Sequence, residues 1–70
     1  MEYFVVAVLL VQGAAPQTTT LHAPQCKPAM EQMVKSYGLV SYIKSWSNSS
    51  MKAAHNGMSL TVTCSLIKKG

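Results

Sequence analysis

The chain has 70 residues, which is enough for one small domain. It contains six lysines and no arginine, its acids are Glu2 and Glu31, and its net charge is +4. The lack of arginine argues against nucleic acid as a partner, because arginine grips phosphate as a fork and reads guanine with two hydrogen bonds. We interpret the lysines as solvated charges that keep a small protein soluble.

The first predicted element is the apolar run from Tyr3 to Val11. A helix that crosses a bilayer needs about 20 apolar residues, whereas the core of a signal peptide has about 7–15. Val11 and Gly13 fit the small-residue pattern before a cleavage site, so we predict a signal peptide at 1–13 that is cleaved between Gly13 and Ala14. The segment lacks the usual early lysine or arginine, and the alternatives are a buried β-strand or a retained membrane anchor.

The segment 14–25 combines two prolines with three threonines and shows no periodicity. This composition predicts a flexible N-terminus of the mature chain. The remainder, 26–70, is then expected to be a single small domain.

A helix is predicted from Pro28 to about Tyr37, because its apolar residues repeat at helical spacing. Pro28 suits the first helical position, and Glu31 suits the first turn, where the helix dipole favours an acid. Gly38 is expected to break the helix. The apolar face consists of Met30, Met33, Val34 and Tyr37.

The segment 39–46 is predicted to be either a second helix or a strand. Trp46 is expected to be its largest core residue. A polar loop follows at 47–50, and a short helix is predicted at 51–55, closed by Gly57 in the left-handed conformation.

Residues 58–66 alternate strictly between apolar and polar, which predicts a half-buried strand. A lone strand is unstable, so this strand needs a partner. In a chain that begins at Ala14, the partner is either 39–46 or another molecule, and the second case indicates dimerisation or binding.

Cys26 and Cys64 are the two cysteines, and an even count in a short exported chain predicts a disulfide. The bridge would stabilise the fold by about 4 kcal/mol on the loop-entropy estimate. The fold class we predict is a small α+β domain in which this disulfide staples the helix to the C-terminal strand.

The chemistry-bearing residues are few. The set His22, Cys26, His55 and Cys64 does not match the spacing of a zinc site, so we predict no metal and no cofactor. The chain has no aspartate for a Ser-His-Asp triad, and one carboxylate side chain after cleavage cannot form a catalytic pair, so we expect no enzyme. Asn48 begins an N-x-Ser sequon and is a predicted glycosylation site.

We infer a secreted, basic polypeptide with one disulfide that acts by binding an extracellular protein or receptor. It would be a signalling or modulatory component of a glandular, reproductive, salivary or venom secretion. Homodimerisation is a further form of binding under this hypothesis. The first alternative is a cationic host-defence peptide that acts on membrane surfaces. The second is an intracellular or membrane-associated product that keeps its N-terminal segment.

Overall fold

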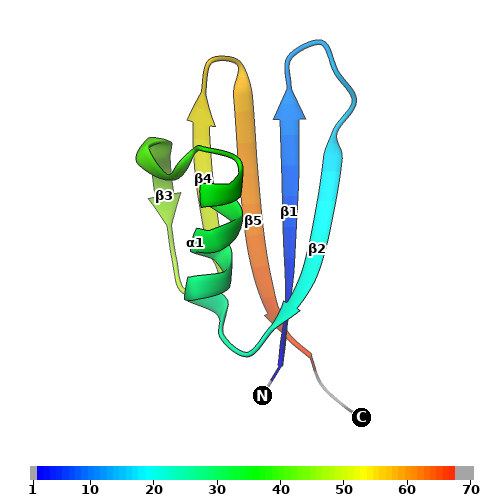
Figure 1. Ribbon diagram of the computed structural model, residues 1–70, viewed down its shortest axis with the longest axis vertical. Helices are drawn as coiled ribbons and strands as arrows, with labels where there is room; N and C mark the ends of the chain where they lie inside the picture. The colour runs from blue at the N-terminus through cyan, green and yellow to red at the C-terminus, as the bar shows by residue number, and fades with distance from the viewer. Residues whose placement is uncertain (1, 68–70) are drawn as a thin grey trace.

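In residues 2–67, the part of the chain that the computed structural model describes, five strands form one antiparallel sheet and one helix covers one of its faces (Figure 1). The strand order is β2-β1-β5-β4-β3. A single 3-10 turn, η1, precedes the shortest strand. The elements are β1 (Tyr3–Val11), β2 (Gln17–Ala23), α1 (Cys26–Ser36), η1 (Val40–Tyr42), β3 (Ile43–Trp46), β4 (Ser50–His55) and β5 (Met58–Leu66).

The predicted core of the signal peptide forms strand β1, which lies between β2 and β5 in the sheet. Val5, Ala7 and Leu9 are buried beneath the helix, and Phe4, Val6 and Val8 on the other face are half-buried. A central strand with neighbours on both sides, one buried face and one half-buried face can have a continuous apolar sequence, as a signal core also does. Cleavage between Gly13 and Ala14 would remove β1, and this cleavage stays a prediction about processing.

The segment predicted to be flexible, 14–25, instead contains strand β2, and that expectation is wrong for Gln17–Ala23. All seven residues pair with β1, from Leu9 opposite Gln17 to Tyr3 opposite Ala23. Threonine favours extended backbone because its branched Cβ packs well on a pleated surface. If 1–13 is a leader, the threonines have no evident partner, because the strand that pairs with them is β1.

The predicted helix is confirmed, although it begins at Cys26, two residues before Pro28, so Glu31 lies beyond the first turn. Met30, Met33 and Val34 are buried against the sheet. Gly38 ends the helix as expected, with a positive φ of 73°. The N–H of Gly38 donates to the Lys35 carbonyl at 2.9 Å, and that of Leu39 donates to the Val34 carbonyl at 3.1 Å. This pair of bonds is the Schellman motif, and it turns the chain so that Leu39 is buried.

The predicted helix at 51–55 is wrong, because these residues belong to strand β4. Asn56 and Gly57 both have positive φ, 53° and 77°, and they join β4 to β5 in a two-residue hairpin. Asn-Gly is the favoured sequence for such a turn. The left-handed conformation expected of Gly57 is therefore present, but it closes a hairpin and not a helix.

The strand predicted at 58–66 is confirmed as β5. Its partners are β1 on one side and β4 on the other, so the expectation that only 39–46 or a second molecule could pair with it is wrong. The segment 39–46, predicted to be either a second helix or a strand, contains the single 3-10 turn η1 followed by strand β3, so the strand alternative holds for Ile43–Trp46.

The predicted disulfide is confirmed and joins Cys26, the first residue of α1, to Cys64 on β5, with the Cα atoms 5.8 Å apart. It fixes the helix across the centre of the sheet. The predicted class, a small α+β domain with one disulfide, is therefore the observed one, with a larger sheet than expected.

The two faces of the sheet differ. The face under α1 holds the core, whose largest fully buried side chains are Met30, Leu39, Leu60, Val5, Val34 and Val62. We call the opposite face the open face, since nothing in the described part of the chain covers it. By strand alternation, it presents an apolar row from β1 between rows of hydroxyl side chains: Phe4, Val6, Val8 and Leu10 are flanked by Thr18 and Thr20 of β2 and by Ser59, Thr61, Thr63 and Ser65 of β5.

Candidate functional site

Exposed large apolar side chains gather on the segment from η1 to β3. Val40, Tyr42 and Trp46 are 48%, 41% and 59% exposed, and two others, Leu10 and Leu66, lie on different strands. Trp46 was expected to be a core residue, and this expectation is wrong. Grouped apolar side chains in water mark contact surfaces more often than single ones do.

A groove runs between α1 and this segment. Its larger part has a volume of about 350 Å³ and is lined by Lys27, Glu31, Val40, Ile43, Trp46 and Met51. Along the helix it adjoins a hollow of about 250 Å³, which shares Glu31 and Val40 and adds Pro28, Gln32 and Lys35. We refer to these nine residues together as the α1–β3 groove. Its floor is apolar, because Met51 is buried and Ile43 packs against the core.

The position of Trp46 follows from the sheet register. Trp46 pairs with Met51, whose side chain points into the core, so the indole also lies on the helix side of the sheet. However, β3 is the edge strand, and α1 packs against β5, β1 and β4. The indole therefore forms the outer wall of the groove and is not covered by the helix.

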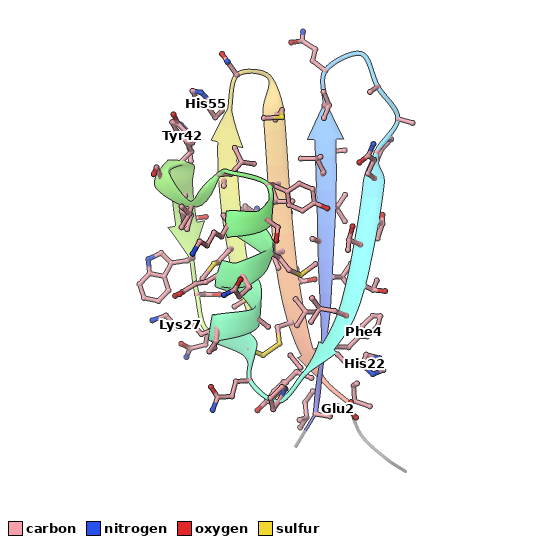
Figure 2. The ribbon with its side chains drawn as sticks, viewed as in Figure 1. Glu2, Phe4, His22, Lys27, Tyr42 and His55 are labelled. Atoms are coloured by element: carbon pink, nitrogen blue, oxygen red, sulfur yellow. A yellow bond between two sulfur atoms is a disulfide. The ribbon has the colours of Figure 1, made fainter. Side chains whose placement is uncertain are left out.

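Lys27 from the first turn of α1 reaches across the groove toward β3 (Figure 2). Its ammonium lies 4.5 Å from the centroid of the Trp46 ring, within the range of a cation–π interaction. This contact holds the exposed indole in one orientation. An aromatic side chain that is ordered before binding loses less entropy when a partner covers it.

The charge around the groove is unbalanced. Lys27 and Lys35 lie on its rim, and Glu31 is the one acid among its lining residues. With an apolar floor and a positive rim, the groove is complementary to an apolar segment that carries carboxylates.

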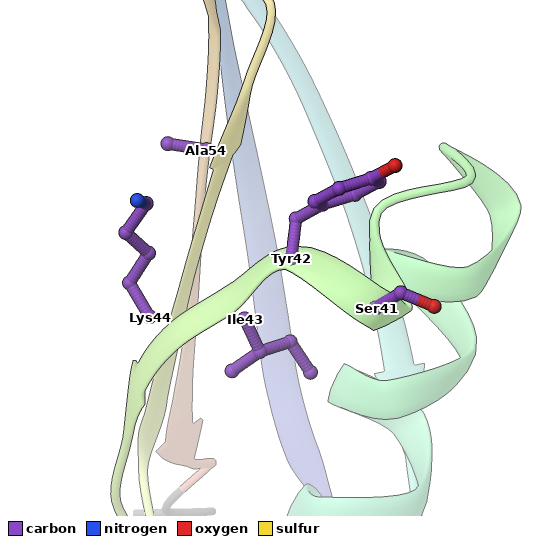
Figure 3. A pocket seen from close by; sticks show the side chains of 5 residues that line it. All are labelled: Ser41, Tyr42, Ile43, Lys44 and Ala54. Carbon is purple, nitrogen blue, oxygen red and sulfur yellow. The ribbon is translucent and has the colours of Figure 1, made fainter.

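Outside the α1–β3 groove, another hollow lies at the bend between η1 and β3, with a volume of about 390 Å³ (Figure 3). Tyr42 and Ser41 stand on one side of it, and Lys44 and Ala54 on the other. The register of β3 against β4 shifts between Ile43 and Ser45, and this bulge bends the strand here. Tyr42 is held by His55, because the two rings stack with centroids 3.7 Å apart and planes 11° from parallel.

The four residues examined as a zinc set are not brought together. Cys26 and Cys64 are bonded to each other, and His55 stacks on Tyr42. His22 lies at the far end of β2, where Nδ1 is 3.5 Å from a Glu2 carboxylate oxygen and the ring meets Phe4 edge-on at 5.5 Å (Figure 2). Within residues 2–67, no three histidine, cysteine or acidic side chains are grouped as metal ligands.

The other predicted sites lie in turns. Asn48 is exposed in the turn between β3 and β4, where the N–H of Ser47 donates to the Ser50 carbonyl at 2.7 Å. Gly13 and Ala14 are exposed in the turn between β1 and β2. Glycosylation at Asn48 and cleavage after Gly13 stay predictions. Among the described residues, no helix is both long and apolar enough to cross a bilayer.

The α1–β3 groove was missed because the sequence pattern did not show that β3 is an edge strand. Leu39, Tyr42, Ile43 and Trp46 have the spacing of one apolar helix face, whereas only Leu39 of the four is fully buried. The bulge after Ile43 shifts the alternation and leaves no regular pattern to detect. Comparison of the chain with protein-family models, with curated proteins and with solved structures finds no match.

Proposed function

We propose that this chain is a small, basic, disulfide-stapled polypeptide that acts in an extracellular setting by binding another protein. The binding surface is the α1–β3 groove, and its target is an apolar segment that bears acidic side chains. The observation that carries the proposal is the exposed Trp46, held by Lys27 at the mouth of an apolar groove with a basic rim. Tryptophan is one of the residue types that are enriched at binding hot spots.

The extracellular setting is supported by the Cys26–Cys64 bridge, because disulfides persist in oxidising compartments and are rare in the cytosol. The exposure of Asn48 is compatible with glycan attachment. This proposal departs from the predicted cleavage after Gly13: strand β1 stays with the chain, since Val5, Ala7 and Leu9 supply part of the core on which α1 rests.

The binding half of the proposal can be tested with two synthetic peptides of equal leucine content, one carrying glutamates and the other lysines. Trp46 is the single tryptophan of the chain, so its fluorescence reports directly on the groove. We expect the acidic peptide to give a saturable blue shift and the basic peptide to give none. Calorimetry should show that Trp46→Ala weakens binding of the acidic peptide by about 2 kcal/mol, or thirtyfold, as for other hot spots.

A matched pair of lysines separates groove binding from diffuse attraction. Lys27→Gln and Lys52→Gln remove the same charge, but Lys52 lies on the open face, away from the groove. We expect a loss of about two- to fivefold for Lys27→Gln, the usual effect of a rim charge, and none for Lys52→Gln. Equal losses, or equal binding of the two peptides, would overturn the groove as the recognition site.

Export is tested by the intact mass of the protein collected from the medium of expressing eukaryotic cells. We expect the oxidised chain, with Tyr3–Val11 retained and with a glycosidase-sensitive mass at Asn48. A reduced, unmodified protein that stays in the cell would contradict the extracellular setting.

A further inference from the structure

The outer edge of the sheet at β2 has an unusual composition for an edge strand. Gln17–Ala23 pairs with β1 along one side, and no described segment pairs with its other side. Alternate residues of such a strand present unpaired backbone N–H and C=O groups, which form a template for another strand. Natural edge strands are usually blunted by short length, bulges, proline or lysine.

None of these devices is present within β2. The strand has seven residues, its pairing with β1 shows no register shift, and it contains no lysine or proline. Pro16 and Pro24 lie just outside it and set its limits. The three consecutive threonines are residues that favour extended backbone. The edge is therefore open to strand pairing along its whole length.

The edge is also complementary to itself. Antiparallel pairing of two copies centred on Thr20 places Gln17 opposite Ala23, Thr18 opposite His22, Thr19 opposite Leu21 and Thr20 opposite its own copy. Each pair shares a face of the sheet, because both positions have the same parity along the strand. The one titratable side chain of the strand, His22, then faces a threonine and not a second histidine.

The distribution of charge favours this approach of two basic molecules. The lysines that the structure describes, Lys27, Lys35, Lys44 and Lys52, lie on α1, β3 and β4. Lys44 and Lys52 lie on the two strands farthest from β2 in the sheet, and Lys27 and Lys35 line the α1–β3 groove on the β3 side of the helix. Two copies that meet at β2 therefore keep these charges at the far ends of the assembly.

We propose that the β2 edge binds a second copy of this chain by antiparallel strand pairing about Thr20, which gives one continuous sheet across the two molecules. The contact is confined to an edge, so the association is weak and depends on concentration. Both α1 helices lie on the same face of the joined sheet, and the two α1–β3 grooves lie at its opposite ends. The dimer would present two grooves at once without covering either.

The decisive variants place a charge on the two-fold axis. Thr20 is exposed on the open face, so Thr20→Lys should leave the monomer folded. In the dimer the Cβ atoms of the two copies lie about 5 Å apart, so the two charges repel each other, which should weaken association about tenfold or more. Thr20→Glu should do the same, and an equimolar mixture of the two variants should restore association, since opposite charges then meet.

Sedimentation equilibrium over a concentration series measures these effects. Thr63→Lys is the matched control, because Thr63 is exposed on the same face but lies on the interior strand β5. We expect wild type and Thr63→Lys to shift together toward twice the monomer mass, and the amide signals of Gln17–Ala23 to gain exchange protection as they do. Circular dichroism should confirm that every variant is folded.

Three results would overturn the inference. One is wild-type protein that stays monomeric at the highest soluble concentration. Another is a dimer that Thr20→Lys does not weaken or that the mixed variants do not restore. The last is a dimer that responds to Leu10→Lys and not to Thr20→Lys, which would assign the contact to the apolar row of the open face. None of these measurements involves the α1–β3 groove, so failure here leaves the proposed function standing.

Discussion

The two edge strands of the sheet, β3 and β2, differ in how open their unpaired backbone groups are to pairing with another strand. At β3 the strand has four residues, carries Lys44 and is bulged, so its backbone makes a poor template for another strand. At β2 the strand has seven residues, is regular and holds no lysine. The large apolar side chains that face water near β3 are missing from β2. One edge is therefore suited to contact through side chains, and the other to contact through backbone.

This contrast shows how a very small protein can keep two contact surfaces apart. The strands between the edges, β1, β5 and β4, hold the sheet side of the core, whereas the edges carry few buried side chains. Variants at the centre should therefore affect both edges through stability, and variants at one edge should leave the other unchanged.

The largest expected effect comes from removing residues 1–13, which deletes β1. The β2 edge then loses the one strand it pairs with, and the core loses Val5, Ala7 and Leu9. We expect the chain that begins at Ala14 to lose its entire free energy of unfolding, about 5 kcal/mol for a domain of this size. Thermal unfolding followed by circular dichroism should show no cooperative transition. A cooperatively folded chain from Ala14 would contradict the central role of β1 and support the predicted cleavage.

The second largest loss of stability is expected when the disulfide is removed. The double variant Cys26→Ala and Cys64→Ala frees α1 from β5 and opens a loop with a sequence separation of 38. The loop-entropy estimate gives a loss of about 4 kcal/mol, measured as a lower urea midpoint at unchanged slope. Wild type in the presence of a reductant should match the double variant. An unchanged midpoint would mean that the bridge contributes nothing to stability.

A smaller effect is expected where α1 turns toward β3. Gly38→Ala puts a Cβ at a positive φ of 73°, and nothing lies within 4 Å of that Cβ, so the cost is conformational alone. We expect a loss of about 1–2 kcal/mol in the free energy of unfolding. Ser36→Ala, an exposed position in the last turn of the same helix, serves as the control and should change stability by less than about 0.5 kcal/mol.

The smallest effect is expected at the β3 edge itself. Lys27→Gln removes the ammonium over Trp46 and should lower stability by about 0.5–1 kcal/mol, the range for exposed cation–π pairs. The emission of Trp46 should change at the same time, because the ring loses its charged neighbour. Lys52→Gln should alter neither quantity. A change in the dimerisation of Lys27→Gln would show that the two edges are coupled.

The elements predicted from the sequence were those whose pattern has one interpretation. The spacing of Met30, Met33 and Val34 fits only a helical face, and the alternation of 58–66 fits only a half-covered strand. The pairing of Cys26 with Cys64 needed no geometry, because the chain has no other cysteine. Local pattern was sufficient in each case.

The missed elements depend on partners distant in the sequence. The run Tyr3–Val11 has a length and composition that suit both an export signal and a central strand, and the neighbours β2 and β5 give it its place in the fold. Met51–His55 contains lysine and two alanines, which favour helix, yet pairing with β5 overrides that preference. Asn56-Gly57 was the local signal that could have identified the hairpin.

The α1–β3 groove could not have been predicted for a related reason. Its walls come from the start of a helix and from an edge strand, and only the order of the sheet brings them together. The exposure of Trp46 depends on how far α1 extends over the sheet, which residue spacing does not record.

The pairing of the first strand with the last has a consequence for how the chain is made. Tyr3 of β1 lies opposite Leu66 of β5, so the central ladder joins residues from nearly the whole length of the described chain. During synthesis β1 leaves the ribosome early, and it stays apolar and half-paired until β5 emerges. Long-range pairing of this kind slows folding and prolongs the exposure of apolar side chains and unpaired strand edges. The nascent protein is therefore expected to depend on holding factors, and to acquire its native sheet only after β5 has left the ribosome.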